Sequence, residues 1–384
     1  MNARGARRLL ARHPWVYRSD VVEAPARPGL YPVFHRGRFL ALAVVNPRSE
    51  ITVRAYAWRP GDPWAALIDR LEAALAARAA DRAARPEGAR RLVHAEGDFL
   101  PGLVVDEYAG HLVATVNTAA LEARLDDLLG RLIERLEPRG VLLKNDSRGR
   151  AAEGLPRYVR PAYGEVPEPL WFREGARWLA AHPRTGQKTG AFLDQRENRL
   201  YAAGLAARHR PRRVLDAFAY QGAFAAQLAP FAEEVVLLDR SREALDSAAR
   251  VFRKNRLPEP KSVEANAFDY LRAAAGRGER YDLVVLDPPS FARRRADLER
   301  AYRAYKEINL RAMALLPPGG LLLTASCSYH LEEPLFLAML REAAGDAGGS
   351  FRLLARRGQA WDHPVLVNVP ETGYLKFAAL EALG

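Results

Sequence analysis

One stretch of the chain reads Val214-Leu215-Asp216-Ala217-Phe218-Ala219-Tyr220-Gln221-Gly222, which is the pattern of a strand, a loop and the start of a helix. The apolar run ends at Asp216, and Gly222 offers a position without a Cβ atom as the helix begins. The same alternation of strand and helix continues from about residue 171 onward. Regular alternation of this kind predicts a parallel, doubly wound sheet.

The other expected elements follow the same order. We expect strands over residues 235–239, 262–264, 281–286 and 320–323, and helices over residues 222–228, 242–255, 268–275 and 298–316. Two further strands, over residues 351–354 and 374–377, would close the sheet with a hairpin. Parallel strands followed by such a hairpin are the layout of the class I (Rossmann-like) methyltransferase sheet, so the predicted fold class is α/β.

The N-terminal part has a different pattern. Short apolar runs at residues 29–34, 39–45 and 51–56 alternate with turns, which predicts a small β-barrel. A helix over residues 64–85 leads into a small central α+β domain, with strands at residues 103–106, 112–116 and 141–144 and a helix at residues 121–136. Residues 161–169 are rich in proline and glycine and suggest a linker or crossover. The predicted domains are residues 1–67, 68–170 and 171–384.

Composition limits the partners. Lys and Arg number 58 against 46 Asp and Glu, a net charge of +12, which favours a polyanion such as nucleic acid. Most of the basic residues are arginine, so a GC-rich genome would produce the same bias without any function. The single cysteine excludes an intramolecular disulfide and a Cys-rich metal site. With no signal peptide and no apolar stretch of about 18 residues, we expect a cytoplasmic protein that uses neither membrane nor metal.

Acidic and amide side chains follow the first three strands of the predicted sheet. Asp216 could take an ammonium group, Asp239 a ribose diol, and Asn266 with Phe268 an adenine ring. The chain lacks the G-x-G-x-x-G pattern of dinucleotide sites, so this order favours S-adenosylmethionine. The alternative is that Asp216 and Asp239 cap helices and that Phe268 belongs to the core.

A polar segment, residues 185–196, lies between apolar stretches and lacks the P-loop spacing. We interpret it as a loop over the cofactor; the alternative is a solvated helix start capped near Asp194. The predicted cofactor set is Lys188, Thr189, Gly190, Phe192, Asp194, Arg196, Asp216, Phe218, Ala219, Tyr220, Gly222, Asp239, Arg240, Ser241, Asn266, Ala267, Phe268, Asp287 and Pro288.

Cys327, the only cysteine, follows the apolar run at residues 320–323. The preceding strand ends in Asp287-Pro288-Pro289-Ser290-Phe291. Open α/β sheets carry out their chemistry at the carboxyl ends of their strands. A thiol and an acidic loop there suggest a methyltransferase with a covalent cysteine nucleophile, whereas a lone cysteine can equally be a packing residue.

These motifs together resemble a known family, the bacterial large-subunit (23S) ribosomal RNA cytosine-5 methyltransferases of the RlmI/RlmO type. The similar segments are residues 187–190, 192–196, 215–222, 287–291 and 326–328, together with Arg7-Arg8-Leu9-Leu10 and His13-Pro14-Trp15-Val16-Tyr17 at the start and residues 100–106 in the centre. The resemblance spans nearly the whole chain. It implies an N-terminal PUA RNA-binding domain, a central α+β domain, a Rossmann-like methyltransferase domain, S-adenosylmethionine as cofactor and ribosomal RNA as partner.

The resemblance also implies a mechanism that forms 5-methylcytosine. Cys327 would add to C6 of cytosine, and Asp287 would bind the N3/N4 edge of the base. A different family of RNA cytosine-5 methyltransferases has a second cysteine in a Pro-Cys motif, but this chain has Pro289-Ser290 there, which excludes a two-cysteine mechanism. The predicted substrate-binding residues are Pro289, Ser290, Phe291, Arg293, Arg294 and Arg295.

Several alternatives stay open. The Asp-Pro-Pro-Ser-Phe loop also occurs in enzymes that methylate guanine nitrogen, so an RNA guanine or adenine N-methyltransferase is the nearest rival. A uracil-5 methyltransferase would use the same covalent chemistry. A non-catalytic RNA-binding assembly factor is a more distant alternative. The chain could also pair with a second copy as a homodimer.

Overall fold

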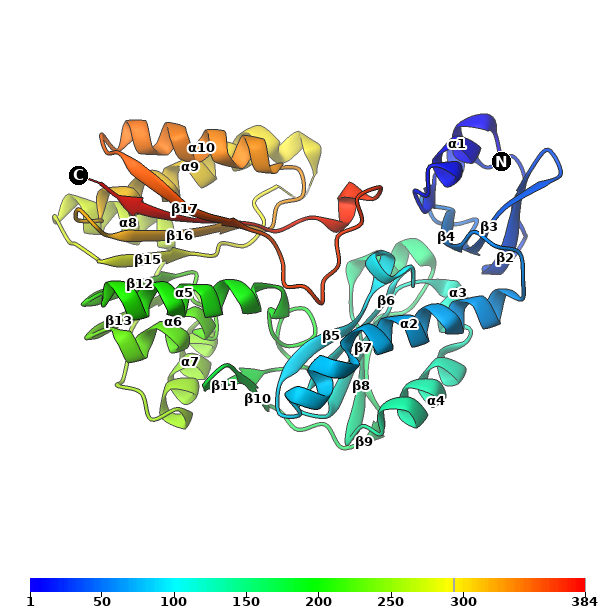
Figure 1. The fold of residues 1–384 in the computed structure, drawn as a ribbon, viewed down its shortest axis with the longest axis horizontal. Helices are drawn as coiled ribbons and strands as arrows, with labels where there is room; N and C mark the ends of the chain where they lie inside the picture. Colours follow the sequence, from blue (N-terminus) through cyan, green and yellow to red (C-terminus); the bar gives the residue numbers. More distant parts are fainter. Residues whose placement is uncertain (293, 384) are drawn as a thin grey trace. The chain divides into compact units, whose positions relative to one another are not determined.

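The computed structural model describes residues 1–292 and 294–383, and these divide into two compact units. The first unit contains residues 1–173, 181–193 and 361–372, and the second contains residues 174–180, 194–360 and the chain from residue 373 on. The segments 181–193 and 361–372 therefore belong to the first unit, although the chain around them belongs to the second. Figure 1 draws the elements of both units.

The second unit is built on one seven-stranded sheet with the order β14-β13-β12-β15-β16-β18-β17. The strands are β12 (Arg213–Ala217), β13 (Glu234–Asp239), β14 (Lys261–Glu264), β15 (Leu283–Leu286), β16 (Leu321–Ser326), β17 (Phe351–Arg357) and β18 (Lys376–Ala382). The first five are parallel, and β18 pairs antiparallel with both β16 and β17. This confirms the predicted Rossmann-like sheet with its closing hairpin.

Helices cover both faces of this sheet (Figure 1). They are α5 (Arg196–His209), α6 (Ala223–Leu228), α7 (Arg242–Lys254), α8 (Ala267–Gly276), α9 (Leu298–Ala314) and α10 (Glu333–Asp346). Helices α5, α6 and α7 lie on one face and α8, α9 and α10 on the other. Fully buried apolar residues such as Leu215, Val236, Val284, Leu322 and Met339 form the core. The strands read as continuous apolar runs because helices cover both faces of a parallel sheet.

The first unit begins with helix α1 (Ala3–Leu10) and a four-stranded antiparallel sheet. Its strands, in the order β1-β4-β3-β2, are β1 (Trp15–Val16), β4 (Val53–Ala57), β3 (Arg38–Val45) and β2 (Gly29–His35). The hairpin between β2 and β3 turns at Arg36 and Gly37, which both have positive φ (49° and 77°). Two left-handed residues in succession are what a tight hairpin turn requires.

The rest of the first unit is an α+β arrangement. Helix α2 (Pro63–Ala84) leads into a five-stranded sheet of β5 (Ala89–His94), β6 (Leu103–Tyr108), β7 (His111–Val116), β8 (Gly140–Asn145) and β9 (Tyr158–Gly164), in that order. Between β7 and β8 lie α3 (Ala119–Glu122) and α4 (Leu125–Leu136). A hairpin of β10 (Leu170–Glu174) and β11 (Arg177–Ala181) follows, with residues 174–180 assigned to the second unit. Short 3-10 turns occur at Arg18–Asp20, Ala95–Asp98, Arg148–Glu153, Leu193–Gln195, Ala229–Phe231, Arg295–Asp297 and Pro370–Thr372.

Two local predictions were wrong. The predicted linker begins inside β9, where Pro161 lies in an edge strand opposite a shift of register between Val141 and Leu142. An edge strand tolerates proline because its outer N–H groups make no ladder hydrogen bonds. The helix expected over residues 121–136 is two helices, separated where Arg124 leaves the helical conformation (φ −119°, ψ 21°).

Buried hydrogen bonds connect the late segment 361–372 to the rest of the first unit. Arg78, on α2, donates to both carboxylate oxygens of Asp98 (2.8 and 2.9 Å) and to the carbonyl of Asp362 (3.0 Å). The Asp362 side chain accepts the backbone N–H of Arg91 (3.0 Å) and contacts His363 (2.7 Å). Detachment of the segment would leave the Asp362 carbonyl and the N–H of Arg91 without these partners, which is unfavourable for buried polar groups.

Candidate cofactor and cysteine site

The loop between β12 and α6 is tightly wound. Phe218, Tyr220 and Gly222 all have positive φ (63°, 48° and 69°). A Cβ atom at Gly222 would lie 2.9 Å from the Cβ of Ala248 on α7, so only glycine lets α6 approach α7 this closely. Left-handed backbone at Phe218 and Tyr220 costs free energy, and such strain concentrates at ligand-binding loops.

Asp216 lies at the end of β12 and is 1% exposed. Its Oδ2 accepts the backbone N–H of Ala225 in α6 at 3.0 Å. Burial raises the pKa of Asp216 to about 8; the Ala225 hydrogen bond opposes this rise, the nearby carboxylates Asp287 and Asp239 add to it, and Arg199 opposes it. A buried carboxyl beside two other acids is a site where a positively charged group would be stabilised.

Asp239, at the end of β13, connects two loops. One carboxylate oxygen accepts the backbone N–H of Tyr220 and the other that of Ser241, both at 2.9 Å. Ser241, not Asp239, caps helix α7. Asn266 does cap a helix, because its side chain accepts the backbone N–H of Phe268 at the start of α8 (2.9 Å). Asp216 accepts an N–H in the first turn of α6, although Gly222 is the N-cap residue, and Asp239 does not cap α7. Phe268 is partly buried and packs against the core.

Aromatic rings connect the predicted adenine region with the Asp287 loop. The ring of Phe291 lies with its centroid 4.6 Å from Tyr305, 5.8 Å from Phe268 and 6.4 Å from Phe218. Phe218, Phe268 and Phe291 are half-buried, and Tyr305 is fully buried. The half-buried rings pack on one another and still offer surface to a planar ligand.

A chain of side-chain amides orients Asp287, which follows β15. The amide of Gln195 donates to Asp287 Oδ1 at 2.9 Å, and Asn198 donates to Gln195 Oε1 at 2.7 Å. Arg357 in turn donates to Asn198 Oδ1 at 3.1 Å. With its oxygen engaged by Asn198, Gln195 must present N–H donors to Asp287. The sequence analysis missed Gln195 and Asn198, although Gln195 lies inside the polar segment 185–196.

Cys327 follows β16 and is half-buried. Strands β15 and β16 are parallel neighbours, with Leu286 opposite Thr324, so Asp287 and Cys327 leave the sheet at the same edge. Ser328 connects the two loops. Its buried hydroxyl contacts Ser290 Oγ (2.9 Å) and Tyr305 OH (2.9 Å) and accepts the N–H of Ala292 (3.2 Å).

A buried lysine, also missed by the sequence analysis, lies beside the same strand end. Lys376 begins β18 and is paired in register with Ser326. Its ammonium donates to the carbonyls of Ser328 (2.6 Å) and Tyr374 (2.8 Å), and the residue is 8% exposed. Burial lowers the pKa of Lys376 to about 8, while Cys327 and two glutamates at the start of α10 act to raise it.

The polar segment 185–196 divides between the units. Lys188, Thr189, Gly190 and Phe192 belong to the first unit, whereas Asp194 and Arg196 belong to the second. The Thr189 hydroxyl donates to Asp106 and shares a 2.8 Å hydrogen bond with Tyr108. In the second unit, Tyr374 donates to Asp194 Oδ2 at 2.8 Å. Each part of the polar segment is thus hydrogen-bonded within its own unit, and the segment ends where α5 begins at Arg196.

The remaining predicted residues are placed as follows. Ala219, Ala267 and Pro288 are buried, while Arg240, Ser241, Pro289, Arg294 and Arg295 are exposed. Arg293 lies outside the described residues. Among residues 1–292 and 294–383, no group of three or more His, Cys, Asp or Glu side chains is placed to hold a metal ion. No helix in this described part is both long and apolar enough to cross a membrane.

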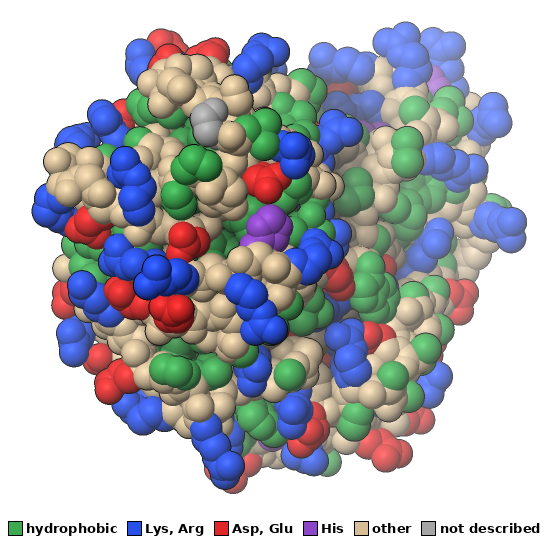
Figure 2. Space-filling model, turned by 60° about the vertical axis from the view of Figure 1, so that its left-hand side comes forward, with side chains coloured by type: hydrophobic (Ala, Val, Ile, Leu, Met, Phe, Trp, Pro, Cys, Tyr) green, Lys and Arg blue, Asp and Glu red, His purple; other side chains and the backbone are tan. Residues whose placement is uncertain are grey.

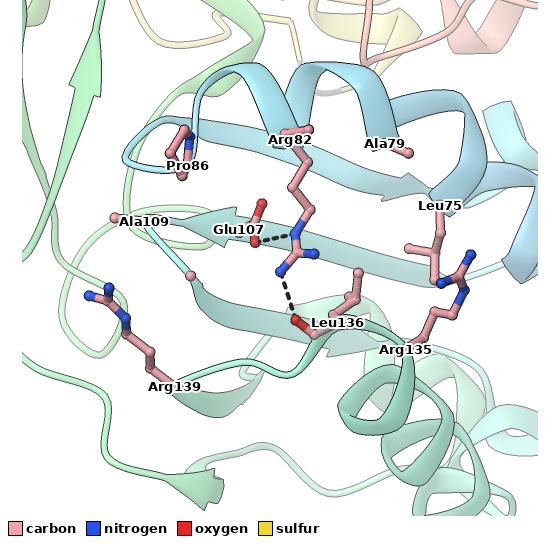
Figure 3. A pocket seen from close by; sticks show the side chains of 11 residues that line it. Leu75, Ala79, Arg82, Pro86, Glu107, Ala109, Arg135, Leu136 and Arg139 are labelled. Atoms are coloured by element: carbon pink, nitrogen blue, oxygen red, sulfur yellow. Dashed lines mark hydrogen bonds and ion pairs between the residues drawn. The ribbon is translucent and has the colours of Figure 1, made fainter.

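A separate pocket lies in the first unit, with a cavity volume of about 390 Å³. Figure 3 shows Arg82 at its centre, donating to Glu107 (2.7 Å) and to the carbonyl of Leu136 (2.7 Å). The exposed side chains of Arg135 and Arg139 also line it. Lys and Arg side chains are scattered over the face drawn in Figure 2 and are not gathered in one patch.

The fold and the loops at its strand ends define a class of protein, a PUA-like domain followed by a methyltransferase domain. Residues 1–58 match the PUA-like domain family, and residues 166–368 match the family described as S-adenosylmethionine-dependent methyltransferase. The chain belongs to this family of S-adenosylmethionine-dependent methyltransferases.

Relatives match along nearly the whole chain. A protein of Tolumonas auensis named Ribosomal RNA large subunit methyltransferase I is 35% identical, covering 98% of this chain and 96% of that protein. Its namesake in Yersinia pseudotuberculosis is 36% identical over 96% and 95%. Among solved structures, a methyltransferase from Streptococcus mutans aligns with a TM-score of 0.84, 18% identity and coverage of 99% and 98%. A methyltransferase complexed with SAH has a TM-score of 0.83, 19% identity and the same coverage.

Proposed function

We propose that this chain methylates C5 of a cytosine in large-subunit ribosomal RNA, with Cys327 as the covalent nucleophile. The observation that carries the proposal is the pairing of two loops at one sheet edge. Cys327 leaves β16 beside the Asp287 loop on β15, and Ser328 hydrogen-bonds to that loop. The names of the relatives supply ribosomal RNA as the substrate class.

The acidic strand ends fit the cofactor. We assign Asp216 to the ammonium of the methionine moiety, because a buried carboxyl with a pKa raised to about 8 needs a cationic partner to stay ionised. Asp239 would accept the ribose hydroxyls, and Asn266 with Phe268 would bind the adenine. Asp194 and Arg196 are proposed as further contacts, while Lys188, Thr189, Gly190 and Phe192 stay predictions from the sequence. The cofactor supplies the methyl group that becomes bonded to C5.

The residues of the chain would activate the base. C5 of cytosine is a poor nucleophile, and addition of the Cys327 thiolate to C6 turns the ring into an enamine whose C5 can accept a methyl group. Transfer of the C5 proton to a general base or to water then restores the C5–C6 double bond, breaks the S–C6 bond and releases the thiolate. Asp287, oriented by Gln195, would bind the N3/N4 edge of the base and stabilise the adduct.

The target base must leave its stack to reach a strand end, so the RNA around it has to be held in place. We assign this to the PUA-like domain and to exposed arginines, among them Arg294 and Arg295 beside the Asp287 loop. Arg135 and Arg139 at the pocket of the first unit are further candidates for phosphate contacts. Phosphate contacts of this kind weaken steeply with added salt.

The test is methyl transfer from labelled S-adenosylmethionine to naked and assembled large-subunit RNA, followed by nucleoside analysis. We expect 5-methylcytidine from the wild-type protein and none from Cys327→Ala. RNA that carries 5-fluorocytidine should trap a covalent complex with the wild-type protein only, because fluorine at C5 cannot leave as a proton does. Methylated guanosine or adenosine, or full turnover by Cys327→Ala, would refute the covalent mechanism, and 5-methyluridine would refute the choice of base.

A further inference from the structure

We propose that Lys376 is a positioning residue that keeps the Cys327 thiol in its thiolate form. The inference rests on the proposed role of Cys327 as nucleophile, and it adds the group that makes this cysteine reactive. A thiolate, not a thiol, adds to a base, so an enzyme of this kind needs a positive charge near the sulfur. Lys376 is the buried cation at this strand end.

Two hydrogen bonds fix the ammonium beside the cysteine. Strand pairing sets Lys376 opposite Ser326, the residue before Cys327. The ammonium donates at 2.6 Å to the carbonyl of Ser328, the residue after Cys327. Lys376 therefore contacts the backbone both before and after Cys327, at Ser326 and at Ser328. A second bond, 2.8 Å to the carbonyl of Tyr374, anchors it from its own strand.

Burial at this position is unfavourable for the charged form of a lysine. The residue is 8% exposed, and both acceptors that it binds are neutral carbonyls. Burial of a charge without an anionic partner is unfavourable, so an anion close to Lys376 would stabilise its charged form. An ammonium has three N–H donors, and two are used here, which leaves the third for an anion. A thiolate at Cys327 is the anion that the reaction requires.

The other ionisable groups around the pair are consistent with this assignment. Charge on Cys327, Glu332 or Glu333 acts to raise the pKa of Lys376, and the two glutamates lie at the start of α10. Burial raises the pKa of Tyr305, on α9, to about 12, and charge on Cys327 adds to this rise. Tyr305 therefore remains neutral near pH 7. Lys376 is a buried cation at this end of β16, and Glu332 and Glu333 are the acidic groups that act on it.

The test uses the fact that the chain has one cysteine. Alkylation by iodoacetamide, followed by intact mass, reports on Cys327 alone across a pH series. We expect the wild-type rate to reach half its maximum below pH 8.5, the usual thiol pKa. Lys376→Met should raise this midpoint by about one unit or more, which slows alkylation at pH 7 about tenfold. Lys376→Arg should restore most of the rate.

A matched control separates this effect from a general change in charge. Lys306→Met removes a lysine of the same unit that is ion-paired with Glu342 and Asp346 at the surface, and it should leave the midpoint unchanged. Lys376→Gln provides a second, polar variant if the methionine variant is unstable. An unchanged midpoint in folded Lys376→Met or Lys376→Gln would overturn the inference, even if turnover were lost. If Cys327→Ala still methylates RNA, the proposed function fails while the thiol titration can still stand.

Discussion

Replacement of Asp216 by asparagine should stabilise the protein without cofactor and weaken its binding of cofactor. Asparagine has the same shape, and its side-chain oxygen can still accept the N–H of Ala225. The pKa of Asp216 is raised from 3.8 to about 8 by burial, and each pKa unit is worth about 1.4 kcal/mol. The ionised form therefore costs the folded protein on the order of 5 kcal/mol, and asparagine removes this cost.

The pH dependence has a defined sign. Between about pH 4 and pH 8 the folded protein holds a proton on Asp216 that the unfolded chain has released. The contribution of Asp216 to stability therefore falls as pH rises through this window and is constant above pH 8. Thermal unfolding of wild type and Asp216→Asn from pH 5 to pH 9 should show a difference in favour of the variant that grows with pH and then levels off.

Cofactor binding, unlike stability, should favour the wild-type protein over Asp216→Asn. SAH should stabilise the wild-type protein, and its affinity should fall up to about tenfold per unit as pH drops from 8 to 6, because the ammonium binds the ionised carboxylate. Asp216→Asn loses a charged hydrogen bond, worth about 1.5–3 kcal/mol, or roughly 10- to 150-fold in Kd. Calorimetric titration of SAH measures this. The assignment of Asp216 to the ammonium would be refuted if wild type and Asp216→Asn bound SAH equally well. It would also be refuted if the difference in stability between the two proteins did not change with pH.

Four further outcomes follow from the site. Gln195→Ala should reduce kcat about tenfold or more with little change in SAH affinity, because it removes the donor that orients Asp287; single-turnover kinetics separate the two. Gly222→Ala should destabilise the protein by about 2–4 kcal/mol in denaturant unfolding, from positive φ and the 2.9 Å approach to Ala248. Ser328→Ala should lower methyl transfer more than it lowers SAH binding, since it separates the Cys327 and Asp287 loops. Arg139→Glu should weaken RNA binding without an effect on SAH binding, measured at several salt concentrations.

The strand ends could be predicted from the sequence because a parallel sheet follows simple rules. Apolar runs bounded by acidic residues locate β12, β13 and β15, and helices between them force their carboxyl ends to one edge. Asp216, Asp239, Asp287 and Cys327 are found in this way without any coordinates. The order of these residues favoured S-adenosylmethionine and the net charge favoured nucleic acid, and the family resemblance added ribosomal RNA as the particular partner. The match of residues 166–368 confirms the S-adenosylmethionine-dependent methyltransferase family.

Residues that depend on long-range contacts could not be found in this way. Lys376 lies beside the end of β16 only because β18 is inserted antiparallel between β16 and β17, and no local pattern marks one lysine at the start of a strand as buried. Gln195 meets Asp287 across 92 positions of sequence. The strand at Tyr158–Gly164 was missed because Pro161 argues against a strand unless the strand is known to lie at an edge. Local propensity cannot supply such tertiary information.

The order of the strands also explains how one sheet edge can serve two opposite electrostatic needs. A cationic cofactor group needs negative charge, and we assign it to Asp216 at the end of β12. The carboxylates of Asp239 and Asp287, which follow the neighbouring strands β13 and β15, act electrostatically on Asp216. A thiolate needs the reverse, because a nearby carboxylate would raise its pKa. Cys327 leaves β16, one strand beyond Asp287, and on its other side the neighbouring strand is β18, which begins with Lys376. The sign of the local charge thus changes across β15 and β16, where we propose that the methyl group passes from cofactor to base.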